Sequence, residues 1–394
     1  MSEVYLDNNA TTKVDPAVLT AMLPFFVERY GNPSSMHGFG GTVGRDVAQA
    51  REQVAALLGC DAREIVFTSC GSEGDNTAIH SALEAQPGKR HLVTTRVEHP
   101  AVLGPMNRLA ESGYDVTLLG VDGQGRLDLD ELAAAIRKDT ALVSVMYANN
   151  ETGVVFPIPE IAALCKERGV LFHTDAVQAA GKLPIDLKAL PADMLTLSAH
   201  KLHGPKGVGA LFVRKGTPFR PFLLGGHQER GRRAGTENTA GLVGLGKACE
   251  LAAVHMAEER TTVAALRDRL QAGLLAAVPD SMVNGGEVER LPNTLSIAFK
   301  YVEGEAILLM LDRFGICASS GSACTSGSLE PSHVLRAMGV PFTFAHGSVR
   351  FSLSRYTTDA EVDLVLQELP GIIARLREIS PYKPGAGEAP ACTC

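Results

Sequence analysis

Residues 194–213 read MLTLSAHKLHGPKGVGALFV, a polar turn between two apolar runs. The runs at 194–197 and 208–213 have the length and composition of buried β-strands. Lys201 lies in the turn, between His200 and Leu202-His203. A lysine in a confined, partly desolvated position has a lowered pKa and can form Schiff bases as an amine nucleophile. A single lysine at a strand end more often extends to water, so other motifs must support the catalytic interpretation.

The whole-chain composition indicates a globular enzyme. The chain has 394 residues, of which 45% are hydrophobic and 21% charged, so we expect two domains. The net charge of −7 argues against non-specific binding to nucleic acid or to an anionic membrane. No apolar run approaches the length of a membrane span, and residues 1–7 lack the features of a signal peptide. We therefore expect a cytoplasmic protein whose eight cysteines are reduced.

Short apolar runs alternate with helical stretches over residues 64–213. This alternation predicts an α/β domain with a mostly parallel sheet and a site at the carboxyl ends of its strands. A long helical region to about residue 278 is expected to bridge to a βαβ-like last third, and the tail from residue 381 is expected to be disordered. The predicted strands are 65–67, 91–94, 116–119, 142–146, 170–172, 194–197, 295–298 and 348–353, and the predicted helices are 15–28, 43–58, 73–86, 100–112, 129–138, 157–168 and 305–313, with a final helix after the capping box at 358–361.

Polar residues follow the strands at one predicted edge of the sheet. Residues 68–73 (TSCGSE) open a helix, where backbone N–H groups and a hydroxyl can bind a phosphate. The other strands are followed by Glu98-His99, by Asn149-Asn150 and by the segment 173–178 (HTDAVQ). Each group alone is better explained as a cap or a turn. Together with Lys201 they supply a phosphate cradle, a Schiff-base lysine, an aspartate and a stacking ring, which indicates pyridoxal phosphate.

The sequence resembles the class V aminotransferase group of the fold-type I transferases, which depend on pyridoxal phosphate. Within that group it resembles the cysteine desulfurases. The resemblance extends from about residue 4 to about residue 380. Its motifs are 7–12 (DNNATT), 31–35 (GNPSS), 149–151 (NNE), 173–176 (HTDA), 200–201 (HK) and 233–238 (RAGTEN). Segments 68–75 (TSCGSEGD) and 226–233 (GHQERGRR) resemble the nitrogen-fixation (NifS-type) branch more than the housekeeping branch.

The resemblance implies an α/β fold with a large domain and a smaller α+β domain. The large, pyridoxal-phosphate-binding domain would span residues 13–257 and contain a mostly parallel seven-stranded sheet flanked by helices. The small domain would combine residues 1–12 with 258–380 and carry the catalytic cysteine on a loop at about 317–330. Residues 381–394 would be a flexible tail, and the enzyme would act as a homodimer.

The resemblance also implies roles for single residues. Lys201 would hold pyridoxal 5'-phosphate as a Schiff base, Asp175 would pair with the pyridinium nitrogen, and Gln178 would bond the ring phenolate oxygen. His99 would stack on the ring and move protons. The phosphate would be held by Gly71, Ser72, Ser198 and His200, and Thr236 would reach the phosphate of the neighbouring subunit. Asn150 would lie beside the ring. Arg350 would bind the substrate carboxylate, with Arg355 as an open alternative.

Cys324 decides the reaction within this group. It lies in the segment 318–328 (ASSGSACTSGS), which predicts an exposed, mobile loop. The resemblance implies conversion of L-cysteine to L-alanine with a persulfide on Cys324. That sulfur would pass to an iron–sulfur scaffold protein, for the clusters of nitrogenase, and Cys324 is a candidate transient ligand of a cluster shared with that partner. Cys317 is interpreted as a core residue and Cys70 as a bystander at the phosphate cradle.

Several alternatives remain open at this level. A housekeeping iron–sulfur desulfurase, a selenocysteine lyase or a true aminotransferase would share the cofactor site, although an aminotransferase does not need Cys324. His173 and Asp175 with a distant histidine could form an iron-binding facial triad. Outside enzymes, the chain could be a passive scaffold for iron–sulfur assembly. Cys392 and Cys394 are interpreted as part of a solvated tail, with a sulfur relay or a metal site as the alternative.

Overall fold

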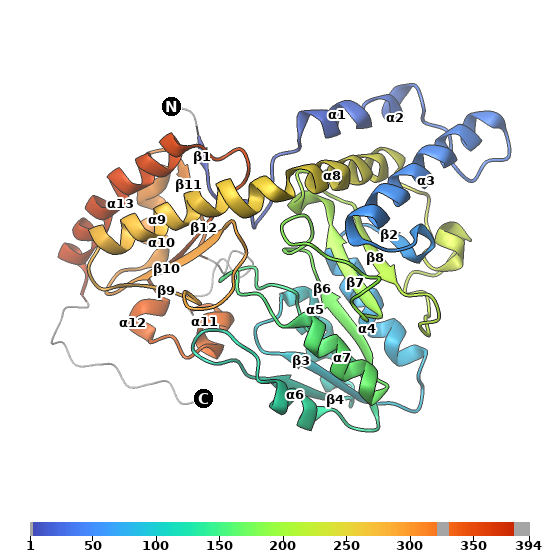
Figure 1. Ribbon diagram of the computed structural model, residues 1–394, viewed down its shortest axis with the longest axis horizontal. Helices are drawn as coiled ribbons and strands as arrows, with labels where there is room; N and C mark the ends of the chain where they lie inside the picture. The colour runs from blue at the N-terminus through green and yellow to red at the C-terminus, as the bar shows by residue number, and fades with distance from the viewer. Residues whose placement is uncertain (1–2, 321–330, 382–394) are drawn as a thin grey trace.

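The computed structural model describes residues 3–320 and 331–381, which form a larger and a smaller body joined by a long helical connection (Figure 1). The larger body holds a seven-stranded sheet in the order β2-β8-β7-β6-β5-β3-β4. Strand β8 is antiparallel to both β2 and β7, and all other neighbours are parallel. The predicted mostly parallel α/β sheet is therefore confirmed. Its strands are β2 (Ile65–Thr68), β3 (His91–Thr95), β4 (Asp115–Leu119), β5 (Thr140–Ser144), β6 (Leu171–Asp175), β7 (Met194–Ser198) and β8 (Gly209–Val213).

The sheet is covered on both faces, which explains why its central strands are almost continuously apolar. Ile65 and Phe67 of β2 contribute to one hydrophobic core and Val66, between them, to the other. Successive side chains of a strand point to opposite faces, so both faces need apolar residues. The helices of this body are α1 (Pro16–Met22), α2 (Pro24–Val27), α3 (Gly38–Leu58), α4 (Gly71–Glu84), α5 (Pro100–Glu111), α6 (Leu129–Ala135), α7 (Ile158–Arg168) and α8 (Thr239–Glu258).

Several predicted boundaries in the larger body were wrong. The predicted helix at 15–28 is divided into α1 and α2, α6 ends at Ala135 and β6 extends to Asp175. Helix α3 begins at Gly38, five residues before the predicted start, because the His37 ring accepts a hydrogen bond from the Gly40 N–H and caps a glycine-rich first turn. The predicted strand at 142–146 is displaced to β5 (Thr140–Ser144), although the residues at 145 and 146 remain buried. Apolar character identified the buried segment, but the ladder of hydrogen bonds set its ends.

The smaller body contains an antiparallel sheet in the order β9-β10-β12. This corrects the βαβ-like prediction, since β10 (Thr294–Phe299) and β12 (Ser348–Ser352) pair directly and run in opposite directions. Helices α11 (His333–Ala337) and α12 (Phe342–Ala345) lie in the connection between them and were not predicted. The other elements of this body are β1 (Val4–Tyr5), β9 (Ser281–Val283), α9 (Ala264–Ala277), α10 (Gly304–Asp312), β11 (Ile316–Cys317) and α13 (Asp359–Ile379).

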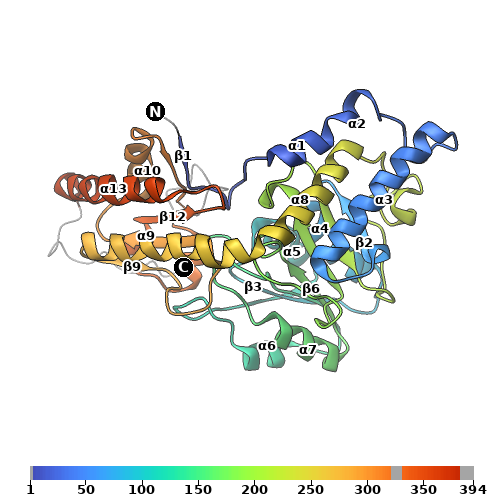
Figure 2. The same ribbon diagram turned by 45° about the horizontal axis from the view of Figure 1, so that its top comes forward.

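Two segments connect the bodies. Helix α8 passes through a π-helical turn at Glu259–Val263 into α9, so one helical path runs from the larger body to the smaller one (Figure 2). The N-terminal segment starts as β1, which pairs with β11, and then crosses to the larger body, where the Thr12 N–H donates to the His200 carbonyl oxygen at 2.9 Å.

These contacts support, as a proposal, a division into residues 13–257 and residues 1–12 with 258–380. Most of the predicted cysteine loop, residues 321–330, lies outside the described residues, as does the predicted tail from residue 382 onward. None of the helices in the described part of the chain combines the length and the apolar character needed to cross a membrane.

Candidate active site

Lys201 lies in a 3₁₀ turn (Ala199–Lys201) that directly follows β7. Its Nζ donates hydrogen bonds to the carbonyl oxygens of Asn9, at 2.5 Å, and Ala10, at 2.7 Å. The crossing N-terminal segment therefore covers the lysine. Burial lowers the pKa of Lys201 to about 7, and the positive charges of Arg350 and Lys182 act in the same direction. A lysine with this pKa is about half neutral amine at neutral pH, which is the nucleophilic form.

A cavity of about 270 Å³ opens beside Lys201 at the carboxyl ends of the strands. Parallel strands bring their carboxyl ends to one edge of the sheet, and the topology thereby gathers residues that are distant in the chain. The cavity also contacts Asn9 and Asp75, which sequence reasoning did not single out as site residues. The predicted residues that line it are Gly71, Ser72, His99, Asn150, Asp175, Gln178, Ser198, His200, Lys201 and Arg350.

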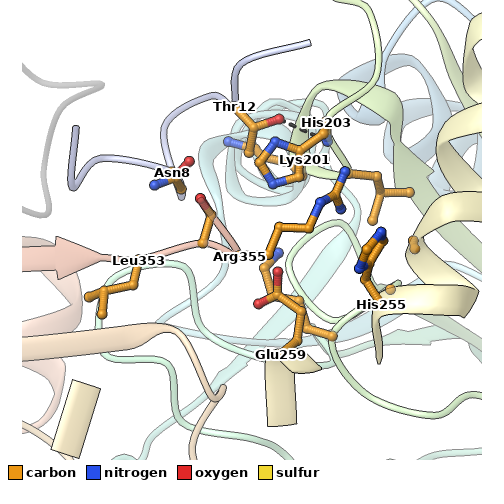
Figure 3. Close-up of a pocket in the computed structure, with 13 residues that line it drawn as sticks. Asn8, Thr12, Lys201, His203, His255, Glu259, Leu353 and Arg355 are labelled. Carbon is orange, nitrogen blue, oxygen red and sulfur yellow. Dashed lines mark hydrogen bonds between the residues drawn. The ribbon is translucent and has the colours of Figure 1, made fainter. Parts of the chain in front are cut away.

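Three predicted residues are not among those that line this cavity. Thr236 is exposed in the segment before α8. Arg355 lies in an ion pair with Asp15 at 2.7 Å and lines a separate, smaller cavity on another side of Lys201 (Figure 3). Of the two candidate arginines, Arg350 is therefore the one beside the cavity. Cys324 lies outside the described residues.

The chain on both sides of residues 321–330 is held at the cavity. Before it, the Ser319 N–H donates to the Arg350 carbonyl oxygen at 3.1 Å, and the Arg350 N–H donates to the Ser319 carbonyl oxygen at 2.6 Å. After it, the Ser332 hydroxyl donates to the buried carboxylate of Glu151 at 2.5 Å, and an Nε2–H of His333 reaches the Glu98 carbonyl oxygen at 2.9 Å. Both ends of this segment are therefore attached to residues of the site or their direct neighbours.

The helix α4 begins at the cavity and presents an N-terminus there. Its N-cap, Cys70, makes no side-chain capping bond. Ser198 contributes a buried Oγ that has no hydrogen-bond partner within the described residues. A Cβ added at Gly71 would come within 2.9 Å of Val177 Cγ2, so glycine is required for the close approach of the helix to the loop after β6. Free N–H groups, a helix dipole and an unpartnered hydroxyl are the donor set that binds a phosphate.

Asp175 stands at the end of β6 and accepts a hydrogen bond from the Val177 N–H at 2.9 Å. Burial raises its pKa to about 6, although the nearby Lys201 ammonium opposes the shift. Burial also raises the pKa of Glu98 to about 8 and that of Asp75 well above its usual range, the latter with a contribution from Asp175. A buried carboxylate that faces the cavity can therefore bind a proton, or a protonated ring nitrogen, close to neutral pH.

His99 forms the N-cap of α5, where its Nδ1 accepts a hydrogen bond from the Ala101 N–H at 3.1 Å. The acceptor role of Nδ1 places the proton of the neutral ring on Nε2. Burial lowers the pKa of His99 to about 4, and the charge of Lys201 adds to the effect. Pro100 begins the helix and fixes the backbone beside His99, which orients the ring as a wall of the cavity. The low pKa keeps the ring neutral at pH 7.

Arg350 on β12 is the buried cation of the site. Its Nη2 donates to Asp7 Oδ1 at 2.7 Å and its Nη1 to the Asn150 carbonyl oxygen at 3.0 Å. Its Nε is buried without a partner in the described residues. The guanidinium group therefore retains a donor for an anionic group of a ligand.

The iron-binding alternative is not supported by the geometry of His173. Its Nδ1 lies 2.9 Å from the Ser144 hydroxyl and its Nε2 lies 2.9 Å from the Thr196 hydroxyl, so both ring nitrogens are engaged within the sheet. Burial lowers the pKa of His173 to about 3. Within residues 3–320 and 331–381 there is no group of three His, Cys, Asp or Glu residues arranged to hold a metal ion.

Comparison with known proteins relates this arrangement to one family. The chain matches the family described as aminotransferase class-V over residues 4–365. It is 64% identical over 383 residues to a protein named cysteine desulfurase from Trichormus azollae, and the alignment covers 97% of this chain and 96% of that protein. It is 61% identical over 388 residues to cysteine desulfurase NifS of Azotobacter vinelandii, with 98% and 96% covered. A solved structure described as a NifS-like protein has a TM-score of 0.90 at 41% identity and covers 95% of this chain and 100% of that chain.

Proposed function

The chain belongs to the aminotransferase class-V family and is a cysteine desulfurase, and from this premise we propose that Lys201 carries pyridoxal phosphate while Cys324 takes the sulfur of L-cysteine. The observation that supports this proposal most strongly is the buried Lys201, which has a pKa of about 7 and lies beside a cavity with unpaired polar atoms. Enzymes of this family depend on pyridoxal phosphate. The proposal concerns which residues of this chain hold it and what they do.

The cavity fits a phosphorylated pyridine ring. Ser198 Oγ and the N-terminus of α4 at Gly71 and Ser72 offer donors to the phosphate, with His200 beside them. At the opposite side, Gln178 Oε1 and the Asp175 carboxylate are buried, and the former has no partner in the described residues. An aspartate with a pKa of about 6 would pair with a protonated ring nitrogen, and His99 would supply the stacking face.

Pyridoxal phosphate, when bound, supplies an electron sink that acidifies the Cα–H bond of an amino acid. Lys201 Nζ is the base that removes this proton, because a pKa of about 7 leaves much of the amine unprotonated at neutral pH. Arg350 binds the substrate carboxylate through its free Nε and orients the Cα–H bond toward the lysine. Asn150, whose carbonyl oxygen accepts from Arg350, borders the same space.

Sulfur transfer is assigned to Cys324. Its thiolate attacks the sulfur of L-cysteine, an S–S bond forms, and the Cβ–S bond of the substrate breaks. The electron pair of the broken bond is protonated as L-alanine forms, so the products are L-alanine and a persulfide, with no added oxidant. The attachments of Ser319 and Ser332 support this role, since these two residues flank the segment that contains Cys324 and both are held at the site.

Beyond the reaction, we propose a homodimer that delivers sulfur to an iron–sulfur scaffold protein for nitrogenase. Leu23, Phe26, Val27 and Tyr30 are exposed by 54–72% on and after α1 and α2, an apolar surface that a second copy could cover. Thr236 is exposed and thus open to a neighbouring subunit. The resemblance of segments 68–75 and 226–233 to the nitrogen-fixation branch, and the identity to NifS of Azotobacter vinelandii, support the assignment to nitrogenase.

One experiment with two variants tests these roles. Wild-type protein given L-cysteine should form L-alanine and gain 32 Da on the peptide that contains Cys324, as seen by mass spectrometry. Cys324→Ala should keep the visible band of the bound cofactor and lose the added mass, whereas Lys201→Ala should lose the band and the borohydride-trapped adduct. Sulfide release by Cys324→Ala would contradict the role of Cys324, and cofactor-independent binding of a cluster without alanine formation would favour a passive scaffold.

A further inference from the structure

A second lysine, Lys182, is buried in the larger body close to Lys201. It follows the turn after β6 and is 7% exposed. Its Nζ donates to the Gln178 carbonyl oxygen at 3.1 Å, which is its one hydrogen bond to a described residue. Lysine is almost never buried unless it is paired, so this position requires a specific reason. The mechanism above makes no use of it.

The carboxylate that faces Lys182 belongs to Glu259, in the π-helical turn between α8 and α9. Glu259 is 6% exposed, and its Oε2 has no partner within the described residues. Both side chains line a cavity of about 20 Å³. Lys201, His203 and Arg355 also line it, and Figure 3 shows these three with Glu259. This volume can hold about one water molecule. The small cavity thus connects Lys182 and Glu259 to Lys201, which also lines the larger cavity.

We propose that Lys182 is a positioning residue for the desulfurase reaction, whose buried ammonium group holds Gln178 at the cofactor cavity and favours the neutral amine form of Lys201. The inference rests on the proposed function of Lys201 and adds a residue that acts through it.

Hydrogen bonds link Lys182 to Lys201 through the residues between them. Lys182 binds the backbone of Gln178, and the Gln178 Nε2 donates to the Asn9 carbonyl oxygen at 2.9 Å. That same oxygen accepts the 2.5 Å hydrogen bond from Lys201 Nζ. Loss of the Lys182 ammonium would therefore loosen the turn at Gln178, whose side-chain amide holds the Asn9 carbonyl oxygen that orients Lys201.

The charges around Lys201 explain why Lys182 matters electrostatically. Arg350 is compensated by an ion pair with Asp7 at 2.7 Å, so the net charge of that pair is close to zero. Lys182 has no carboxylate within ion-pair distance in the described residues, and its positive charge is therefore less compensated at Lys201. Burial lowers the pKa of Lys182 to about 8, against the effect of Glu259, so it remains mostly charged at pH 7. The other titratable groups that face Lys201 from the surrounding elements are Asp7, Asp75, His99, Asp175, His200, His203, His255, Glu259, Arg350 and Arg355.

The pH dependence of cofactor capture by the apoprotein tests this proposal. Apoprotein is mixed with pyridoxal phosphate between pH 6 and pH 9, and the growth of the visible band gives a rate constant that follows the fraction of neutral Lys201. In Lys182→Met the profile should move upward by roughly one pH unit, which makes capture at pH 7 about fivefold slower. Lys182→Arg keeps the charge and should retain the wild-type profile at neutral pH.

The double variant Lys182→Met/Glu259→Gln removes both buried charges and guards against a fold that fails on an unpaired Glu259. It should show the same upward shift. Thermal unfolding of each variant distinguishes this electrostatic effect from a purely structural one. A structural effect would lower the stability of the protein without moving the pH profile of cofactor capture. Wild-type profiles in folded Lys182→Met and in the double variant would overturn the inference. A wild-type protein that forms no visible band would instead overturn the proposed function, and the inference with it.

Discussion

Several buried polar atoms of the cavity residues have no hydrogen-bond partner in the described part of the chain. Ser198 Oγ, Gln178 Oε1 and Arg350 Nε are all buried without a partner in the described residues. A buried polar atom without a hydrogen bond costs about 1–3 kcal/mol, so these atoms oppose folding of the empty site. A ligand that supplies their partners recovers this free energy and stabilises the folded state. The unpaired atoms of the cavity therefore support the proposed binding of the cofactor and the substrate there.

Ser198→Ala should affect cofactor binding without destabilising the apoprotein. Removing an unpaired hydroxyl should leave the free energy of unfolding of the apoprotein unchanged or raise it by about 1 kcal/mol. The Kd for pyridoxal phosphate should rise about 5–10-fold, since about 1–1.4 kcal/mol of phosphate binding is lost. Spectroscopic titration and denaturant unfolding of the apoprotein measure the two quantities.

Ser144→Ala is the matched control for this experiment. The Ser144 hydroxyl is paired with the buried Nδ1 of His173, at 2.9 Å, away from the cavity wall. Its loss leaves that nitrogen unsatisfied, so the apoprotein should lose about 1–3 kcal/mol of unfolding free energy. The two serines should thus have opposite effects on the apoprotein. A destabilised Ser198→Ala apoprotein with unchanged Kd would contradict the assignment of Ser198 to the phosphate.

Among the elements, α3 is attached to the sheet by one buried ion pair. Arg51 of α3 donates to both carboxylate oxygens of Glu229, at 2.6 and 2.8 Å, and to the Ile65 carbonyl oxygen at 2.9 Å. The Phe67 N–H on β2 donates to the same carboxylate at 3.0 Å. Glu229 and Arg230 adopt left-handed backbone conformations, with φ of 48° and 60°, which bring this carboxylate to the helix. One pair thus joins a helix, an antiparallel edge strand and a turn.

Arg51→Ala should lower the stability of the protein by about 3–5 kcal/mol, because it leaves the Glu229 carboxylate buried without its partner. Denaturant or thermal unfolding of the full-length protein measures the loss. Arg63→Ala is the control. The Arg63 side chain is 77% exposed, so its ion pair with Asp61 is screened by water and its loss should have little measurable effect on stability. Equal effects of the two variants would show that burial does not set the strength of the Arg51 pair.

The whole molecule exposes apolar surface that its own cores leave uncovered. Phe26 and Val27 of α2 are 61% and 72% exposed, and Leu23 and Tyr30 beside them are exposed as well. Helices α1 and α2 lie at the periphery of the larger body (Figure 1). Contiguous apolar surface of this kind is typical of protein–protein interfaces and fits the proposed homodimer.

Sedimentation of the wild-type protein should give twice the chain mass of 41.7 kDa. Phe26→Asp/Val27→Asp should shift the protein toward the monomer, because two charges cannot be buried against an apolar partner surface. Leu309→Asp on α10 is the control, since Leu309 is 71% exposed on the smaller body and should leave the mass unchanged. A double variant that remains dimeric would place the interface elsewhere.

Local sequence patterns were sufficient for most of the elements, and most of the residues proposed for the site line one cavity. Apolar runs of three to six residues identified the strands of the larger sheet, and the capping box at Thr358 and Glu361 marked the start of α13. The register of strands was harder, as β5 shows, because hydrogen bonds to β3 and β6 set its ends rather than its own composition. Helix α3 was predicted from Val43 because its apolar spacing begins there. In the structure the His37 cap starts the helix earlier, and Gly40 packs closely against Asn32.

By itself, the sequence determined the α/β class, the cofactor chemistry expected at Lys201 and the family, since these depend on periodicity and on short motifs. Only the tertiary structure decided that Arg350 and not Arg355 borders the cavity, because strand β12 and an ion pair with Asp15 direct the two side chains into different cavities. It also decided that Lys182 and Glu259, 77 residues apart in sequence, line one small cavity together with Lys201. The physical reason is that charge and burial act through distances in space, which a local pattern of residues does not contain.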